Sequence, residues 1–164
     1  MNLEEMEKRL RRLEDVEAIK ALHRDYIFGL NNRQWHEMAG CFTDDAKALI
    51  FRHPLCEGKE QISRLFTDTM SRVNTGKGRD AHFATMPVVS VEGDRARGHW
   101  LLYILIADPE TGNAWKWTQG RYECEYRRVQ DQWKFSKLVW VNPWPRTPES
   151  LPGLEDVMAL GIEL

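Results

Sequence analysis

His82 lies between a helix-like first half and a strand-rich second half of the sequence, in the stretch Arg79-Asp80-Ala81-His82-Phe83. An imidazole with an ordinary pKa of about 6.5 is partly neutral at pH 7 and can act as a general base. The phenol of Tyr26 can donate a hydrogen bond to a substrate oxygen, and the amide of Asn31 can accept one from an imidazole nitrogen. These three residues are therefore candidates for acid–base chemistry.

Asp80 is the nearest carboxylate to His82 along the chain. Residues two apart on a strand share a face and lie about 6 to 7 Å apart, which is long for a direct hydrogen bond. We therefore expect Asp80 to be solvated at the start of its strand rather than to act as a partner of His82.

Metal and cofactor sites are not indicated by the sequence. His53 and Cys56 are the only closely spaced pair of soft ligands, and two ligands do not make a zinc site. Gly-rich phosphate loops and nucleophile elbows are missing. We predict no metal, no cofactor and reduced thiols at Cys41, Cys56 and Cys124. The other histidines, His23, His36 and His99, are weaker candidates than His82.

Composition narrows the class of protein. A length of 164 residues predicts one domain, residues 1–164, with a single core. Lys and Arg number 23 against 25 Asp and Glu, which argues against nucleic acid as a partner. No run approaches the ~20 apolar residues of a membrane span, and no secretory signal is evident, so we expect a cytoplasmic protein without a membrane partner.

The elements that would position these residues follow from periodicity. Apolar residues recur every three or four positions through residues 3–31, which predicts one long amphipathic helix that ends at Asn31 and Asn32. Further helices are predicted over 34–41 and 59–72, and Asp44-Asp45 should separate the first of these from a strand over 46–52. Long strands are predicted over 80–91, 95–107, 114–128 and 132–142, with turns at Gly93, at 108–113 and at Gln130-Asp131.

This order of elements resembles the nuclear transport factor 2-like superfamily, and its SnoaL-like group in particular. The local patterns that carry the resemblance are Leu13-Glu14-Asp15-Val16-Glu17-Ala18-Ile19-Lys20-Ala21-Leu22 and Asp131-Gln132-Trp133-Lys134-Phe135-Ser136-Lys137-Leu138. The resemblance implies an α+β fold, a cone-shaped, cystatin-like barrel of three or four N-terminal helices on a strongly curved, mixed, mainly antiparallel sheet. Residues 1–12 would form an amphipathic N-terminal arm, and residues 143–164 a Pro-rich C-terminal arm.

The resemblance also implies roles for the candidate residues. In lyases of this family, a pocket histidine removes a proton from carbon, a carboxylate on the first helix stabilises the imidazolium, and a tyrosine often assists the leaving group. His82 and Tyr26 fall at the histidine and tyrosine positions. Asn31 stands where the family has its aspartate, and Ile104 stands at a second acidic position. His82 then works without a charged partner, or the reaction differs, or the pocket does not catalyse.

Seven tryptophans in 164 residues favour a wide, apolar pocket. The predicted substrate-binding residues are Ala48, Ile50, His53, Trp100, Leu102, Ile104, Arg121 and Trp140. The resemblance implies a cofactor-independent lyase of dehydratase type, or an isomerase, that acts on a bulky hydrophobic ring-containing molecule. The alternative is a non-catalytic ligand-binding or subunit-assembly module. In either case we expect a homodimer or homotrimer.

Overall fold

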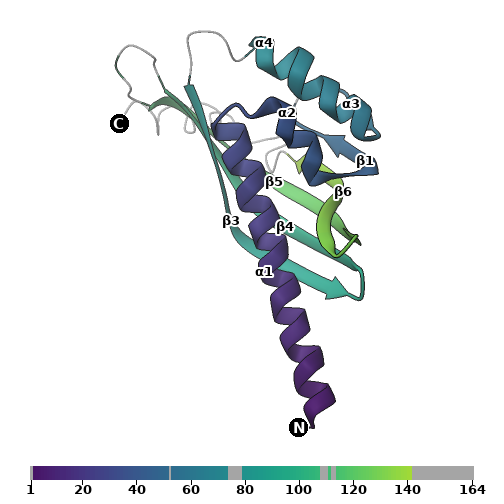
Figure 1. Cartoon of the computed structure of the whole chain (residues 1–164). Coiled ribbons are helices and arrows are strands. Elements are labelled where there is room, and N and C mark those ends of the chain that lie inside the picture. Colours follow the sequence, from purple (N-terminus) through teal and green to yellow (C-terminus); the bar gives the residue numbers. More distant parts are fainter. Residues whose placement is uncertain (1, 52, 74–78, 108–110, 112–113, 142–164) are drawn as a thin grey trace, which may run out of the picture.

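The structure is a computed structural model that describes residues 2–51, 53–73, 79–107, 111 and 114–141. Helices lie against one face of a curved sheet, and the chain order runs from helices to long strands (Figure 1). The predicted fold class, an α+β cone of the cystatin-like kind, is confirmed. The C-terminal arm, residues 143–164, lies outside the described residues.

Helix α1 spans Leu3–Asn31, as the sequence predicts. Asn2 caps its first turn, since the Asn2 side chain accepts a hydrogen bond from the backbone N–H of Glu5 at 2.8 Å. At the other end, Arg33 has a left-handed backbone with a φ of 60°. This turn carries the chain off the helix and toward α2, Trp35–Met38, and a 3-10 turn, Ala39–Cys41.

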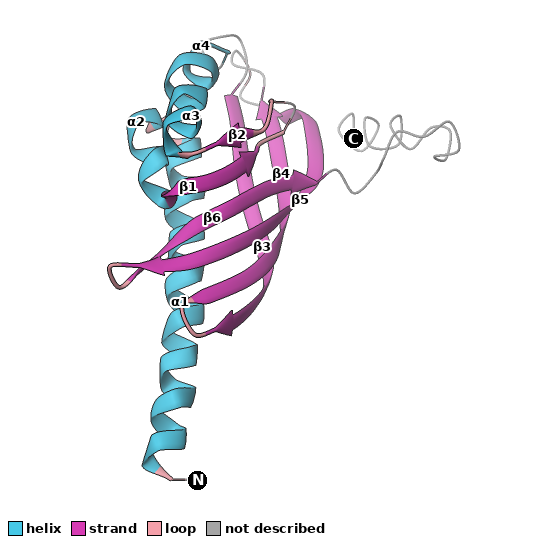
Figure 2. Ribbon diagram, turned by 90° about the vertical axis from the view of Figure 1, so that its right-hand side faces the viewer, coloured by secondary structure: helices cyan, strands magenta, loops and turns pink. Residues whose placement is uncertain are grey.

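The first third of α1 projects beyond the sheet (Figures 1 and 2). Its apolar residues Leu3, Met6, Leu10 and Leu13 are exposed, whereas Ile19 farther along is buried. A helix turns by about 100° per residue, so this exposed stripe lies on roughly the opposite side of α1 from Ile19. The expectation of a single apolar stripe along the whole helix is therefore wrong, because the stripe changes face.

Strand β1 spans Phe42–Leu49, several residues earlier than the predicted strand over 46–52. Asp44 and Asp45, which the sequence suggested as a helix end, lie within β1. The strand begins early because Phe42 pairs with Phe135 of β6 in the sheet and is fully buried. A two-residue strand that the sequence did not predict, β2, Cys56–Glu57, pairs with β1.

The predicted helix over 59–72 is present in three parts. They are α3, Lys59–Arg64, a π-helical segment, Leu65–Met70, and α4, Ser71–Val73. Ile62, Leu65 and Phe66 are buried, as an apolar face requires. None of the helices in the described part of the chain is long and apolar enough to cross a membrane.

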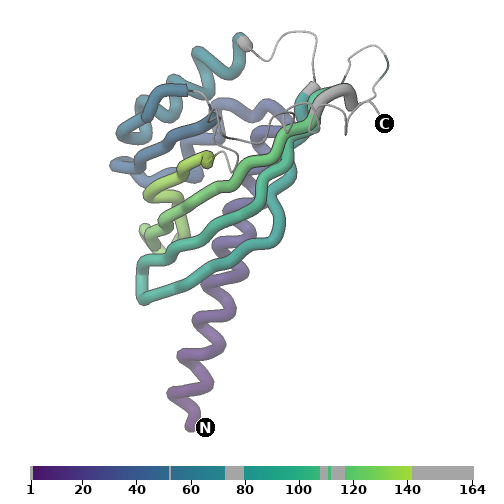
Figure 3. The backbone as a smooth tube through the Cα atoms, turned by 180° about the vertical axis from the view of Figure 1, so that it is seen from behind, coloured from purple at the N-terminus to yellow at the C-terminus, as the bar shows by residue number. Residues whose placement is uncertain are grey.

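Four long strands complete the sheet: β3, Arg79–Glu92, β4, Arg95–Ala107, β5, Ala114–Val129, and β6, Gln132–Val141. Their order is β2-β1-β6-β5-β4-β3, with β1 and β6 parallel and the other pairs antiparallel. Figure 3 shows β3, β4 and β5 running side by side. Gln130 and Asp131 both have positive φ, as a tight two-residue hairpin turn requires. Among the described strands β3 lies at the edge of the sheet, so one side of its backbone does not pair with another of them.

Candidate functional site

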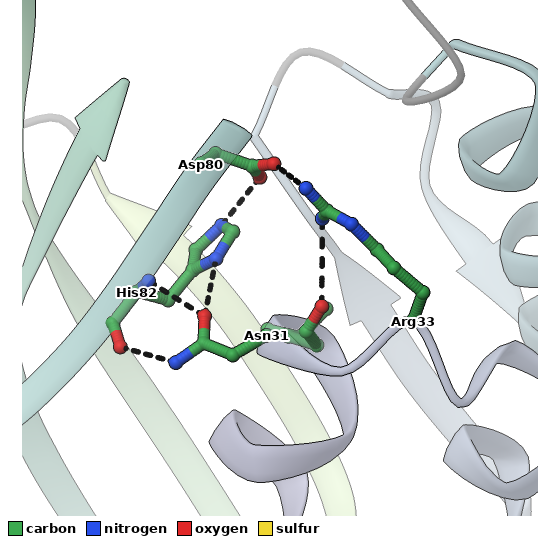
Figure 4. Close-up of polar contacts among 5 residues, drawn as sticks. Asn31, Arg33, Asp80 and His82 are labelled. Atoms are coloured by element: carbon green, nitrogen blue, oxygen red, sulfur yellow. Dashed lines mark hydrogen bonds and ion pairs between the residues drawn. The ribbon is translucent and has the colours of Figure 1, made fainter. Parts of the chain in front are cut away.

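His82 and Asn31 meet where the end of α1 crosses the free edge of β3 (Figure 4). The Asn31 amide donates through Nδ2 to the backbone carbonyl of His82 at 3.0 Å, and its Oδ1 accepts from the backbone N–H of His82 at 2.7 Å. The same Oδ1 lies 3.3 Å from Nδ1 of the imidazole. The structure thus brings these two predicted site residues together.

These contacts determine the orientation of the Asn31 amide. Turning the Asn31 amide over would place its NH2 against the His82 N–H and its oxygen against a carbonyl, so the observed orientation is the favourable one. Oδ1 is only an acceptor, so an N–H at Nδ1 of His82 can donate to it.

Nε2 of His82 faces a carboxylate that the sequence analysis set aside. Oδ2 of Asp80 lies 3.6 Å from Nε2, and Arg33 binds the other carboxylate oxygen of Asp80 (Figure 4). The expectation of a solvated Asp80 is wrong, since its side chain is only 19% exposed and ion-paired. The spacing of about 6 to 7 Å applies to the backbone of residues two apart, whereas these side chains lean toward each other.

Burial dominates the electrostatics of His82. It lowers the pKa of His82, the Asp80 carboxylate raises that pKa, and the Arg33 guanidinium lowers it. Burial opposes the ionisation of Asp80, but the bond from Arg33 and the charges of His82 and Arg33 outweigh it and lower the pKa of Asp80. At neutral pH the site therefore holds a neutral imidazole beside an ionised carboxylate.

Tyr26 lies deeper in the molecule than the sequence suggested. It is fully buried, with its ring centroid 5.4 to 6.4 Å from those of Phe42, Phe66, Tyr122 and Phe135. Among the described residues its hydroxyl forms no hydrogen bond with His82, and its polar neighbour is the hydroxyl of Tyr122. Burial raises the pKa of Tyr26, which keeps the phenol protonated at neutral pH.

A second buried histidine, His23, lies in a polar cluster, although it is a weaker candidate than His82 by sequence. Its Nε2 lies 2.7 Å from the hydroxyl of Tyr126, and its ring stacks on Trp100 with centroids 3.9 Å apart. The Trp100 indole N–H donates to the same hydroxyl at 2.9 Å. Burial lowers the pKa of His23 to about 3. Trp100, predicted as pocket lining, is therefore engaged in the core.

Strand alternation decides where the other predicted lining residues lie. Ile104 pairs with His82 across the β3–β4 ladder, so the two side chains share a face. Arg121 lies on the opposite face of β5 from Tyr122 and forms an ion pair with Glu123 at 2.5 Å. Arg121 is thus placed away from His82. Ala48, Ile50 and Leu102 are buried in the core, and His53 is half-buried in the loop after β1.

Trp140 reaches across the sheet over Gly120. A Cβ at Gly120 would lie 2.7 Å from Cε2 of the Trp140 indole, so a side chain there would displace the ring. The Trp140 ring also packs edge-on against Phe51, with centroids 5.1 Å apart. Its indole N–H is buried without a hydrogen-bond partner in the described part of the chain. Trp140 therefore covers the inner face of β5 beside Leu102, which pairs with Gly120.

A cavity of about 400 Å³ lies elsewhere on the sheet. It is lined mainly by charged residues of β1, β3, β4, β5 and β6, among them Lys47, Arg97, Glu125 and Lys137. None of the predicted site residues lines it. Among the residues that the structure describes, no group of three or more His, Cys, Asp and Glu side chains could hold a metal ion.

The profile of the SnoaL-like domain matches residues 11–139, which is most of the chain. The chain belongs to the SnoaL-like domain family. This confirms the resemblance on which the sequence analysis relied. A search of curated proteins gave no match.

Solved structures of similar proteins share this fold. An NTF2-like protein with a cystatin-like fold from Novosphingobium aromaticivorans superposes with a TM-score of 0.73 at 20% identity, over 88% of this chain and 93% of that one. A type 2 hexachlorocyclohexane dehydrochlorinase, LinA, superposes with a TM-score of 0.69 at 25% identity, over 88% and 99%. Another LinA structure gives 0.68 at 24% identity, over 80% and 87%.

Proposed function

We propose that this SnoaL-like protein is a cofactor-independent lyase or isomerase in which His82 removes a proton from a carbon atom of the substrate. The family assignment and the similarity of the structure to hexachlorocyclohexane dehydrochlorinase support a reaction of this class. The observation that carries the proposal is the arrangement of Asn31 around His82. That arrangement holds the imidazole at the edge of β3, and burial favours its neutral form.

The chemistry needs a base that is unprotonated before the reaction. Burial lowers the pKa of His82, so the neutral form predominates at pH 7. Abstraction breaks a carbon–hydrogen bond, moves the proton to the unprotonated ring nitrogen of the neutral imidazole and leaves the electron pair on the substrate. The pair then expels a leaving group in an elimination, or a proton returns elsewhere in an isomerisation.

The substrate class follows from the surroundings of His82. Its cross-strand neighbour is Ile104, and the adjacent pairs on the same face include Ala84 with Leu102, which are apolar. Apolar surroundings favour a hydrophobic substrate whose reactive hydrogen approaches the imidazole. We infer a bulky, ring-containing molecule with an acidic carbon–hydrogen bond, such as one beside a carbonyl group or a carbon–chlorine bond.

The experiment compares the wild-type chain with His82→Gln, which keeps a polar side chain but removes the base. Both proteins are incubated in D2O with ring ketones, β-hydroxy ring ketones and hexachlorocyclohexane. Mass spectrometry follows deuterium uptake and the loss of water or HCl. We expect one class to be converted by the wild type and at least ~10²-fold more slowly by His82→Gln. Equal conversion by both proteins would refute His82 as the base.

A second candidate is a ligand-binding module without catalysis. The observation that favours it is the position of Tyr26, which is enclosed by aromatic rings and forms no hydrogen bond with His82 among the described residues. A binding module would bind a compound of the panel, measured by calorimetry, while the wild-type chain neither exchanges deuterium into it nor eliminates a group from it. That result would favour the module over the lyase.

A further inference from the structure

The charge that the SnoaL-like family places on the first helix is missing from Asn31, but a carboxylate is present on the other side of the imidazole. We propose that Asp80 of β3 is the carboxylate partner of His82, and that Arg33 is a positioning residue that holds this carboxylate in place. The role of Asp80 in the reaction rests on the proposed function of His82, whereas the contact between Asp80 and His82 does not.

The geometry places the two ring nitrogens of His82 between two oxygens. Oδ1 of Asn31 lies 3.3 Å from Nδ1, and Oδ2 of Asp80 lies 3.6 Å from Nε2. An imidazolium has an N–H on each nitrogen, and both would then point at an acceptor. The neutral ring has one N–H and can donate to only one of these two oxygens. The two acceptors thus favour the protonated imidazole, against the opposing effect of burial.

Arg33 is held firmly enough to fix the Asp80 carboxylate. Its guanidinium binds Oδ1 of Asp80 and also lies 3.5 Å from the carbonyl oxygen of Leu30 at the end of α1. The same group lies over the Trp35 ring, 5.6 Å from its centroid. These contacts leave Oδ2 of Asp80 directed at His82 (Figure 4).

Two charged groups act on His82, the Asp80 carboxylate on its own strand and the Arg33 guanidinium after α1. Asn31 is uncharged, and Ile104, the neighbour of His82 on β4, is apolar. Asp80 favours proton uptake by His82, whereas Arg33 and burial oppose it. The base is thus neutral at rest, but the positive charge it gains on taking a proton is stabilised by Asp80.

The test measures the titration of each histidine in the full chain by NMR of the imidazole carbon and nitrogen resonances, with His82 assigned from His82→Gln. Asp80→Asn should lower the pKa of His82 by about one unit, the smallest shift expected from a neighbouring opposite charge. Arg33→Met should raise it, because a positive charge is removed and Asp80 is left unneutralised. The resonances of His23 serve as an internal reference, since His23 lies in a separate cluster.

Asp94→Asn is the matched control, because Asp94 also pairs with an arginine, Arg128, at 2.9 Å. It should leave the titration of His82 unchanged. An unchanged pKa of His82 in Asp80→Asn would overturn the proposal, whatever the activity of the variants. If that pKa moves as expected but His82→Gln remains fully active on a converted substrate, the proposed lyase reaction fails and the Asp80 contact stands.

Discussion

The amide of Asn31 binds both backbone polar groups of His82, its Oδ1 accepting from the N–H at 2.7 Å and its Nδ2 donating to the carbonyl at 3.0 Å. An ionised aspartate could accept from the N–H but has no proton to donate to the carbonyl. Asparagine at position 31 therefore attaches the end of α1 to the edge of β3 in a way that aspartate cannot, while the negative charge is supplied by Asp80.

Asn31→Asp should raise the pKa of His82, because a second carboxylate would then lie next to Nδ1. The variant should also lose about 1 kcal/mol of unfolding free energy, since the His82 carbonyl loses its donor. NMR titration and urea unfolding at pH 7 measure the two effects.

Asn32→Asp is the control for this change. Asn32 also donates to a backbone carbonyl, that of Phe28 at 2.8 Å, but the structure gives it no contact with His82. Both variants should lose similar stability, and only Asn31→Asp should shift the titration of His82. A shift of the same size in Asn32→Asp would contradict the assigned contact.

Asp15 should be one of the most sensitive positions for stability. Its carboxylate is buried and accepts from Arg128 at 2.6 Å and from the Trp133 indole at 3.1 Å, which joins α1 to β5 and β6. Asp15→Ala should lower the unfolding free energy by about 3 kcal/mol, because it leaves the Trp133 indole N–H without its acceptor and leaves Arg128 paired only with the exposed Asp94.

Glu4→Ala provides the comparison for Asp15. Glu4 pairs with Lys8 at 2.7 Å, but its side chain is 73% exposed, so the loss should stay below about 0.5 kcal/mol. Urea unfolding at pH 7 measures both variants. Equal losses would show that Asp15 contributes no more than a surface ion pair.

Gly120→Ala should destabilise the sheet where Trp140 crosses it. The added methyl group would lie against the indole, and moving a packed ring typically costs about 1 to 3 kcal/mol. Gly40→Ala is the matched control, because a Cβ there would meet nothing within 4 Å. Thermal unfolding should show a lower midpoint for Gly120→Ala alone. A normal midpoint for that variant would place the Trp140 ring elsewhere.

The buried His23 should make the protein sensitive to mild acid. Its pKa is about 3 in the folded state, and about 6.5 when unfolded, so the unfolded chain binds the extra proton as pH falls below 6.5. Stability is therefore fully present above pH 6.5 and is lost toward pH 3. His23 alone should remove about 2 kcal/mol by pH 5.

Urea unfolding of the wild type and His23→Gln at pH 7 and pH 5 tests this effect. His23→Gln should be less stable than the wild type at pH 7, because it loses the stack on Trp100, but should lose less stability between the two pH values. The lowered pKa of His82 adds a decline of the same sign in both proteins. Equal declines would show that His23 is not held neutral.

Some residues acquired their environment in ways that periodicity could not reveal. Asp80 was expected to be solvated, because spacing along a strand gives only the separation of the backbone atoms. The direction of its side chain depends on Arg33. The ion pair of Arg33 with Asp80 was not predicted, although a basic residue two positions after Asn31 was a signal for a charged group near this site. Tyr26 was placed on the correct helix, but its depth depends on the rings of β1, β5 and β6 that surround it.

The sequence alone determined the long helix over residues 3–31, the four long strands and the Gln130-Asp131 turn, because each depends on residues close together in the chain. The tertiary structure decided the environment of His82, since Asn31 and Arg33 reach it only where the end of α1 crosses an edge strand some 50 residues later in the chain. Short-range patterns specify elements, whereas the partner that a buried side chain finds depends on how those elements cross.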